Sequence, residues 1–78
     1  MNIIAYIKTG CPWCIGVTNY FKEKGIVYEE KNVTESPSLF EEMKTLSGQT
    51  KAPVVIIDGY MLADTDKDAV DAYLSTKQ

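Results

Sequence analysis

The stretch Cys11-Pro12-Trp13-Cys14 contains the only two cysteines of this 78-residue chain. A disulfide between them would close a very small ring. Such a ring removes little chain entropy from the unfolded state, because that entropy grows with the length of the closed loop. The cysteine pair is therefore a poor structural staple, and its spacing favours reversible redox chemistry.

The residues around the pair predict a strand, a turn and a helix, in that order. Residues 2–7 are apolar at odd and at even positions, as in a central strand that is buried on both faces. Residues 8–10 read as a turn, and Pro12 suits the first turn of a helix. Cys11 then falls at a helix N-terminus, where the dipole and the free backbone N–H groups favour a thiolate.

Other interpretations of the cysteine pair stay open. A zinc site needs four ligands, and the chain has no histidine and no second cysteine pair, so a complete site within one chain is disfavoured. A zinc or iron–sulfur site shared between two chains is a further alternative. Two inert, buried thiols are the last, because free cysteine is often simply part of a core.

The length, the charge and the number of cysteines disfavour several classes of protein. The length predicts a single domain over residues 1–78, and no apolar run approaches the roughly 18 residues of a membrane span. The net charge is −3 and arginine is absent, which disfavours nucleic-acid binding. A start in a strand pattern without an apolar leader, and a single pair of cysteines, predict a cytoplasmic protein. We expect a monomer.

Hydrophobic spacing predicts two helices separated by a strand. The first helix covers residues 12–24 and ends at Gly25, a residue type typical of helix C-caps. A strand follows over residues 26–32. Ser36 caps the second helix, which begins at Pro37 and ends at Gly48. The apolar stripes of the two helices are Cys14, Val17, Thr18 and Phe21, and Leu39, Phe40, Met43 and Leu46.

The last third of the chain predicts a hairpin and a third helix. Residues 53–57 and 60–62 form the strands of the hairpin, and Asp58-Gly59 is a strong turn signal. Residues 65–68 resemble a capping box for the last helix, whose apolar face is Ala69, Val70, Tyr73 and Leu74. The order β-α-β-α-β-β-α predicts an α/β fold with a four-stranded mixed sheet and helices on both faces. A ferredoxin-like sheet is disfavoured, because the hairpin leaves no room for a helix between the last two strands.

The chain resembles the glutaredoxins of the thioredoxin superfamily over nearly its whole length. Residues 6–14, YIKTGCPWC, are close to the family pattern Y-x-K-x-x-C-P-Y-C, with Trp13 in place of tyrosine. Residues 52–55, APVV, stand where the family has T-V-P with a cis proline, and Asp58-Gly59 is followed by an acidic helix start. The resemblance implies a thioredoxin-like fold and a thiol–disulfide oxidoreductase that binds no cofactor and uses glutathione as co-substrate.

In this interpretation Cys11 is the nucleophile and Cys14 resolves the mixed disulfide that Cys11 forms. Lys8 would favour the Cys11 thiolate or pair with a carboxylate of glutathione, and Trp13 would pack beside the bound ligand. If the peptide bond before Pro53 is cis, the backbone of Ala52 would pair with an extended substrate. The candidate substrate-binding residues are Lys8, Trp13, Lys51, Ala52, Pro53 and Asp66. For each of them an ordinary solvated or structural role is the alternative.

Two departures from the family pattern leave the substrate class open. Glutathione-binding members usually carry Thr-Val before the proline and Gly-Gly after the hairpin, where this chain has Lys51-Ala52 and Ala63-Asp64. Ala-Pro-Val-Val is closer to the glutaredoxin-like hydrogen donors of ribonucleotide reductase, which thioredoxin reductase recharges. Those proteins, however, lack Pro-Trp between the cysteines and carry a Trp-Ser-Gly-Phe motif that is absent here.

The active-site segment favours the glutathione class, so the expected partners are glutathione and proteins that contain disulfides. Ribonucleotide reductase is the expected partner under the alternative. A thioredoxin-fold module that binds a partner or a shared metal without turnover is a third hypothesis, and the resemblance implies that Pro12 argues against cluster assembly.

Overall fold

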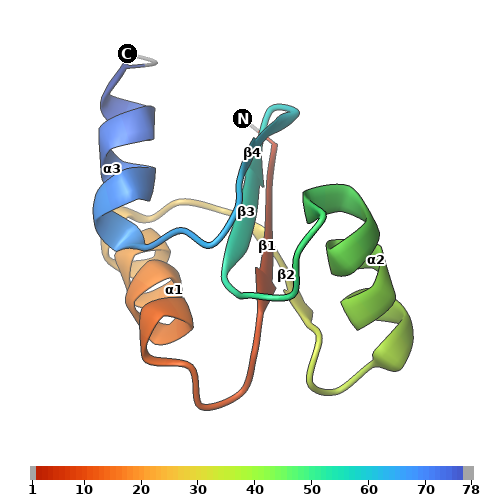
Figure 1. Ribbon diagram of the computed structural model, residues 1–78. Coiled ribbons are helices and arrows are strands. Elements are labelled where there is room, and N and C mark those ends of the chain that lie inside the picture. The colour runs from red at the N-terminus through yellow and green to blue at the C-terminus, as the bar shows by residue number, and fades with distance from the viewer. Residues whose placement is uncertain (1, 77–78) are drawn as a thin grey trace.

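A four-stranded mixed sheet lies at the centre of the computed structural model, which describes residues 2–76 (Figure 1). Its strands are β1 (Ile3–Ile7), β2 (Glu29–Asn32), β3 (Val54–Ile57) and β4 (Tyr60–Leu62), in the spatial order β2-β1-β3-β4. β1 pairs with β2 in parallel, whereas β3 pairs with β1 and β4 in antiparallel fashion. The predicted fold class is confirmed.

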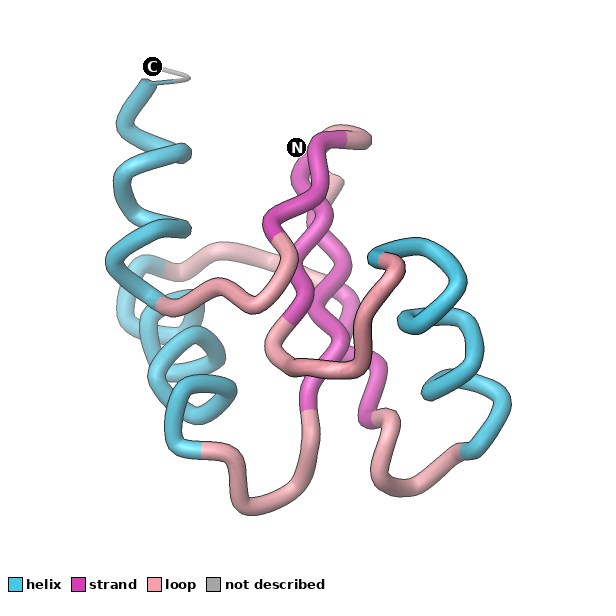
Figure 2. The backbone as a smooth tube through the Cα atoms, viewed as in Figure 1, coloured by secondary structure: helices cyan, strands magenta, loops and turns pink. Residues whose placement is uncertain are grey.

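Three helices cover the two faces of the sheet. α1 (Pro12–Lys24) and α3 (Lys67–Thr76) lie together on one face, and α2 (Pro37–Ser47) lies alone on the other (Figures 1 and 2). Within residues 2–76, no helix combines the length and the apolar character that crossing a membrane requires.

Local sequence signals set the ends of these elements. Gly25, at a φ of 67°, ends α1 and donates its N–H to the carbonyl of Lys22. The Oγ of Ser36 accepts a hydrogen bond from the N–H of Leu39 and caps α2. Asp58 and Gly59 both have positive φ, as a tight hairpin turn between twisted strands requires.

The core consists of two clusters, one on each face of the sheet. β1 contributes Ile3 and Ala5 to the first cluster and Tyr6 to the second, so the prediction of a strand buried on both faces is confirmed. The first cluster also contains Val17, Phe21, Val55, Ile57, Val70 and Leu74, and the second contains Val33, Met43 and Val54.

A polar contact fastens α2 to the sheet beside the second cluster. The hydroxyl of the buried Tyr6 donates a hydrogen bond to the carboxylate of Glu42. The ammonium of Lys31 on β2 lies 2.8 Å from the same carboxylate. Burial first, and then the bond to Glu42, raise the pKa of Tyr6 to about 12.

Three predicted core or cap positions are wrong. Leu46 is half-exposed, because the buried side of α2 continues from Met43 to Ser47, whose Oγ donates to the Met43 carbonyl at 2.7 Å. Ala69 is exposed in the first turn of α3. Asp66 rather than Thr65 caps that helix, since its Oδ1 accepts from the N–H of Ala69 at 2.9 Å.

The strand boundaries also differ from the prediction. β2 begins at Glu29, which pairs with Ile4, and not at residue 26. In this register residues 26 and 27 lie beyond the start of β1 and have no residue of that strand to pair with. Ile26 and Tyr28 nevertheless pack against the first cluster. β1 and β3 each begin one residue later than predicted.

Candidate active site

The two cysteines lie at the start of α1 and are joined by a hydrogen bond. Cys11 is the N-cap of the helix in an extended conformation, and its Sγ accepts from the backbone N–H of Cys14 at 3.3 Å. The sulfur of Cys14 accepts from the N–H of Lys8 at 3.5 Å. Both are free thiols in this structure, Cys11 partly exposed and Cys14 buried.

The sequence folds this way because the chain turns sharply between β1 and α1. Gly10 has a φ of 75°, a conformation that residues with a side chain rarely adopt, and Pro12 follows at the start of the helix. The turn therefore presents the Cys11 side chain at the end of the sheet, while Cys14 points back into the protein.

The two sulfurs differ in their acidity. Burial first, and then the hydrogen bond with Cys11, raise the pKa of the Cys14 thiol to about 12. The N–H of Lys8 and the charge of the Lys8 ammonium act in the opposite direction and lower it. Cys14 is therefore a protonated thiol at neutral pH.

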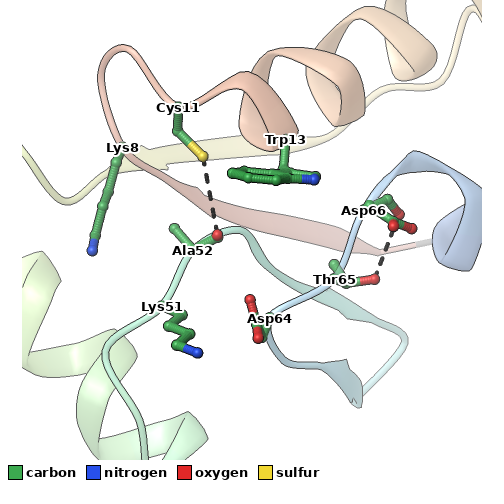
Figure 3. Close-up of a pocket in the computed structure, with 8 residues that line it drawn as sticks. All are labelled: Lys8, Cys11, Trp13, Lys51, Ala52, Asp64, Thr65 and Asp66. Carbon is green, nitrogen blue, oxygen red and sulfur yellow. Dashed lines mark hydrogen bonds between the residues drawn. The ribbon is translucent and has the colours of Figure 1, made fainter.

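An open cavity of about 450 Å³ lies beside Cys11 (Figure 3). The Cys11 sulfur lies 4.0 Å from the carbonyl oxygen of Ala52, which precedes a cis peptide bond to Pro53. Residues from distant parts of the chain line this cleft: Lys8, Cys11, Trp13, Lys51, Ala52, Asp64, Thr65 and Asp66.

Five of the six predicted substrate-binding residues thus surround the cleft. Pro53, the sixth, is fully buried and does not line the cavity. Its carbonyl accepts the backbone N–H of Thr65 at 3.0 Å, which ties the segment before α3 to the segment that carries Ala52. Pro53 can therefore act only through the position of its neighbours.

Lys8 and Trp13 lie on either side of Cys11. The Lys8 ammonium donates to the carbonyl of Thr50 at 2.9 Å and lies 5.8 Å from the centre of the Phe40 ring. Its side chain points away from the Cys11 sulfur (Figure 3). The Trp13 side chain is 63% exposed and forms a wall of the cleft, so an apolar surface is available to a ligand.

Sequence reasoning missed Asp64 and Thr65 as lining residues. Both lie in the loop between β4 and α3, and the hairpin at Asp58-Gly59 returns this loop to the side of Ala52. That turn signal, combined with the three-residue length of β4, was the available clue. Among residues 2–76, no group of three or more histidine, cysteine, aspartate or glutamate side chains is placed to hold a metal ion.

Comparisons with known proteins show which family this chain is similar to. The family model described as Glutaredoxin matches residues 3–62. The chain is 36% identical over 66 residues to the uncharacterized glutaredoxin-like 8.6 kDa protein in the rubredoxin operon of Clostridium pasteurianum, covering 85% of this chain and 88% of that protein. It is 29% identical over 65 residues to glutaredoxin 3 of Escherichia coli K12, covering 83% and 78%.

A solved structure carries the same fold. The glutaredoxin-like protein NrdH-redoxin from Escherichia coli superposes with a TM-score of 0.78 at 24% identity, over 92% of this chain and 93% of that one. At this level of identity, the likeness concerns the arrangement of the strands and helices alone.

Proposed function

The chain belongs to the glutaredoxin family, and on that premise we propose that it is a thiol–disulfide oxidoreductase whose Cys11–Cys14 dithiol is recharged by glutathione. The observation that supports this most directly is the contrast between the two sulfurs. Cys11 is accessible at the mouth of a cleft, and Cys14 is buried one helical turn away within hydrogen-bonding reach.

The first step uses Cys11 as the nucleophile. Its thiolate attacks one sulfur of a substrate disulfide, the substrate S–S bond breaks, and the second sulfur leaves as a thiolate that takes a proton from water. The backbone N–H of Cys14 and the N-terminal end of α1 stabilise negative charge on the Cys11 sulfur before the attack.

The second step uses Cys14 to resolve the mixed disulfide. The hydrogen bond and the charge of Cys11 are among the causes that raise the pKa of Cys14. Both causes disappear once the Cys11 sulfur is bound in a mixed disulfide, so Cys14 then loses its proton more readily. Its thiolate attacks Cys11, the substrate leaves as a thiol, and the protein is left oxidised. Two molecules of glutathione then restore the dithiol and form glutathione disulfide.

The cleft supports binding of a small thiol or an extended peptide. Trp13 offers an apolar wall, and Lys51 and Asp66 offer charges for the ends of the tripeptide. The Ala52 carbonyl, 4.0 Å from the Cys11 sulfur, is placed to accept a backbone N–H of a substrate attached to that sulfur.

One observation favours a second candidate, a hydrogen donor of ribonucleotide reductase that is recharged by thioredoxin reductase. Lys51-Ala52 and Asp64 line the cleft at positions where this chain departs from the glutathione-binding pattern. A protein reductase would recharge the dithiol without any need for a glutathione site.

The Cys14→Ser variant separates the two candidates. With glutathione as the reductant, Cys11 alone can take the glutathionyl group from a glutathionylated protein, and a second glutathione releases it. The variant should therefore keep this activity while it loses reduction of protein disulfides, which need Cys14. Cys11→Ser should lose both activities. If Cys14→Ser is inactive with glutathione while thioredoxin reductase reduces the wild type readily, the second candidate is correct.

A further inference from the structure

Three polar residues form a closed ring of hydrogen bonds at the end of the sheet where the Cys11 turn begins. Thr9 lies in the loop between β1 and α1, and Thr34 lies in the loop between β2 and α2 (Figure 1). Asn32 is the last residue of β2 and pairs with Ile7 at the end of β1. Because the two strands are parallel, both loops leave the sheet at the same end, where their side chains can meet.

Each member of this ring both donates and accepts a hydrogen bond. The side-chain N–H of Asn32 donates to the hydroxyl of Thr9 at 3.1 Å, and the backbone N–H of Thr9 donates to the hydroxyl of Thr34 at 3.0 Å. The backbone N–H of Thr34 closes the ring on the amide oxygen of Asn32 at 2.9 Å, and the N–H of Glu35 reaches the same oxygen at 3.3 Å. Two backbone donors thus fix the amide of Asn32 with its N–H group towards Thr9.

The ring adjoins the backbone group that contacts the Cys14 sulfur. Lys8 directly precedes Thr9, and its backbone N–H donates to the buried Cys14 sulfur at 3.5 Å. Within residues 2–76 it is the only backbone N–H that reaches this sulfur. The position of the Lys8 N–H therefore depends on what holds Thr9 in place.

The Lys8 N–H matters because Cys14 has to become a thiolate in a buried site. A buried charge is costly unless a donor compensates for the lost hydration. Burial and then the hydrogen bond with Cys11 raise the pKa of Cys14, whereas the Lys8 N–H lowers it, followed by the charge of the Lys8 ammonium. Cys11 and Lys8 are the titratable residues that act on this sulfur. A weaker contact with the Lys8 N–H makes the Cys14 thiolate rarer.

From these contacts we propose that Asn32 is a positioning residue of the resolving step. Through the hydroxyl of Thr9, it holds the Lys8 N–H against the Cys14 sulfur. The inference rests on the proposed function, in which Cys14 attacks the mixed disulfide at Cys11. Asn32 has no part in the first attack, because the Cys11 sulfur accepts its hydrogen bond from within the first turn of α1. Loss of the Asn32 side chain should therefore slow the second step and spare the first.

A symmetric chromogenic disulfide makes both steps visible in one stopped-flow experiment. The Cys11 thiolate attacks one sulfur of the reagent, the S–S bond breaks, and a first chromogenic thiolate leaves. Cys14 gives its proton to the solvent and attacks the Cys11 sulfur, and a second thiolate leaves as the protein disulfide forms. Two electrons pass from the protein dithiol to the reagent, so no further reactant is needed. The first release depends on the reagent concentration, and the second does not.

Substitutions in the ring separate positioning from folding. Asn32→Ala should slow the second release about fivefold, as the loss of one typical hydrogen bond implies, and leave the first release nearly unchanged. Thr9→Val removes the hydroxyl but keeps the shape, and should give the same split. Thr9→Ser retains the hydroxyl and should keep the wild-type rates. Ser36→Ala is the matched control, because it removes a hydrogen bond of the same loop, to the N–H of Leu39, without contacting the turn.

A second measurement follows the contact itself in the reduced protein. Exchange of the Lys8 amide hydrogen with solvent, measured by NMR, should be faster in Asn32→Ala and in Thr9→Val, because its bond to Cys14 opens more often. The Cys14 amide hydrogen bonds Cys11 within the first turn of α1 and should exchange at the wild-type rate. A general loss of stability would instead accelerate both.

Each result counts for or against the inference. If Asn32→Ala and Thr9→Val leave the second release unchanged, the inference is wrong and the proposed function stands. The same holds if they slow both releases equally, or if Ser36→Ala also slows the second release, because the loss then follows stability. If Asn32→Ala does not fold, the pair Thr9→Val and Thr9→Ser decides, since Thr9 is exposed. A wild type that releases only one thiolate overturns the proposed function, and the inference with it, because Cys14 then does not resolve.

Discussion

The backbone N–H of Cys14 donates a hydrogen bond to the sulfur of Cys11 at 3.3 Å. The surroundings of the two sulfurs differ. The Cys11 sulfur is partly exposed and accepts this N–H, whereas burial first, and then the side-chain hydrogen bond with Cys11, raise the pKa of the Cys14 thiol. In the proposed reaction, Cys11 attacks first and Cys14 stays protonated until Cys11 has reacted.

The resolving step should accelerate as the pH rises. Cys14 attacks only as a thiolate, and burial, the largest cause of its raised pKa, persists when Cys11 is held in the mixed disulfide. As long as the pH stays below the pKa of Cys14, a rise of one pH unit therefore increases the thiolate fraction about tenfold. The mixed disulfide at Cys11 is formed with a chromogenic disulfide, and release of its second thiol is followed by stopped flow. A rate that stays constant between about pH 6 and pH 8 contradicts this order of events.

Removing the hydroxyl of Tyr6 should destabilise the fold. Tyr6→Phe deletes the bond to Glu42 that fastens α2 to the sheet, and we expect the free energy of unfolding to fall by about 1 kcal/mol. Tyr28→Phe is the matched control, because its hydroxyl bonds Glu30 on the exposed surface. Urea denaturation of both variants measures the difference, and equal losses contradict a special role for the Tyr6 contact.

The Tyr6 contact should also make stability depend on pH in the alkaline range. Folding raises the pKa of Tyr6 from 10.0 to about 12, so the folded protein holds the phenolic proton more tightly than the unfolded chain does. This contribution to stability is complete below the unfolded value and is lost as the pH rises through the folded value. The stability gap between wild type and Tyr6→Phe should therefore shrink above about pH 10.

Features set by residues that are neighbours in the sequence could be predicted, whereas features set by contacts between distant segments could not. The position of Cys11 was predictable, because Gly10 and Pro12 each impose a backbone conformation on the turn that holds it. The inner side of α2 was only partly predictable, because helical spacing from Met43 allows either Leu46 or Ser47 to face inward, and in the structure Leu46 is exposed and Ser47 is partly buried. Contacts between segments that are distant in the sequence were the hardest to predict.

The cleft illustrates that limit. The hydrogen bond from Lys8 to Thr50 joins residues 42 positions apart and turns the ammonium away from the Cys11 sulfur. Asp64 reaches the cleft only because the hairpin turns back beside Ala52. No periodicity or capping rule encodes which side chains face one another across such a space.

Trp13 should contribute to substrate capture and little to stability. Its side chain is 63% exposed, so Trp13→Ala removes few core contacts, and the free energy of unfolding should change by less than about 0.5 kcal/mol. The rate constant for reduction of a glutathione mixed disulfide should fall several-fold. Ile15→Ala is the control, since Ile15 is also exposed on α1 but does not line the cleft. Equal effects of the two variants on the rate contradict a binding role for Trp13.

Asp66 has two roles that substitutions can separate. Its Oδ1 caps α3 through the N–H of Ala69, and its side chain also lines the cleft. Asparagine caps a helix about as well as aspartate does, so Asp66→Asn should keep most of the stability. Asp66→Ala should lose about 1 kcal/mol, because the N–H of Ala69 loses its acceptor.

Loss of the Asp66 charge should weaken substrate binding to the same extent in Asp66→Asn and in Asp66→Ala. If the carboxylate meets the ammonium of glutathione, Asp66→Asn and Asp66→Ala should raise the KM for glutathione by a similar factor, about threefold for an exposed pair. Asp68→Asn controls for the charge at the same helix start, since Asp68 pairs with Lys67 at 3.3 Å and lies outside the cleft. An increase in KM that follows the loss of stability, and is therefore confined to Asp66→Ala, means that Asp66 acts through the helix cap. An increase shared by the two Asp66 variants and absent from Asp68→Asn means that its charge meets the ligand.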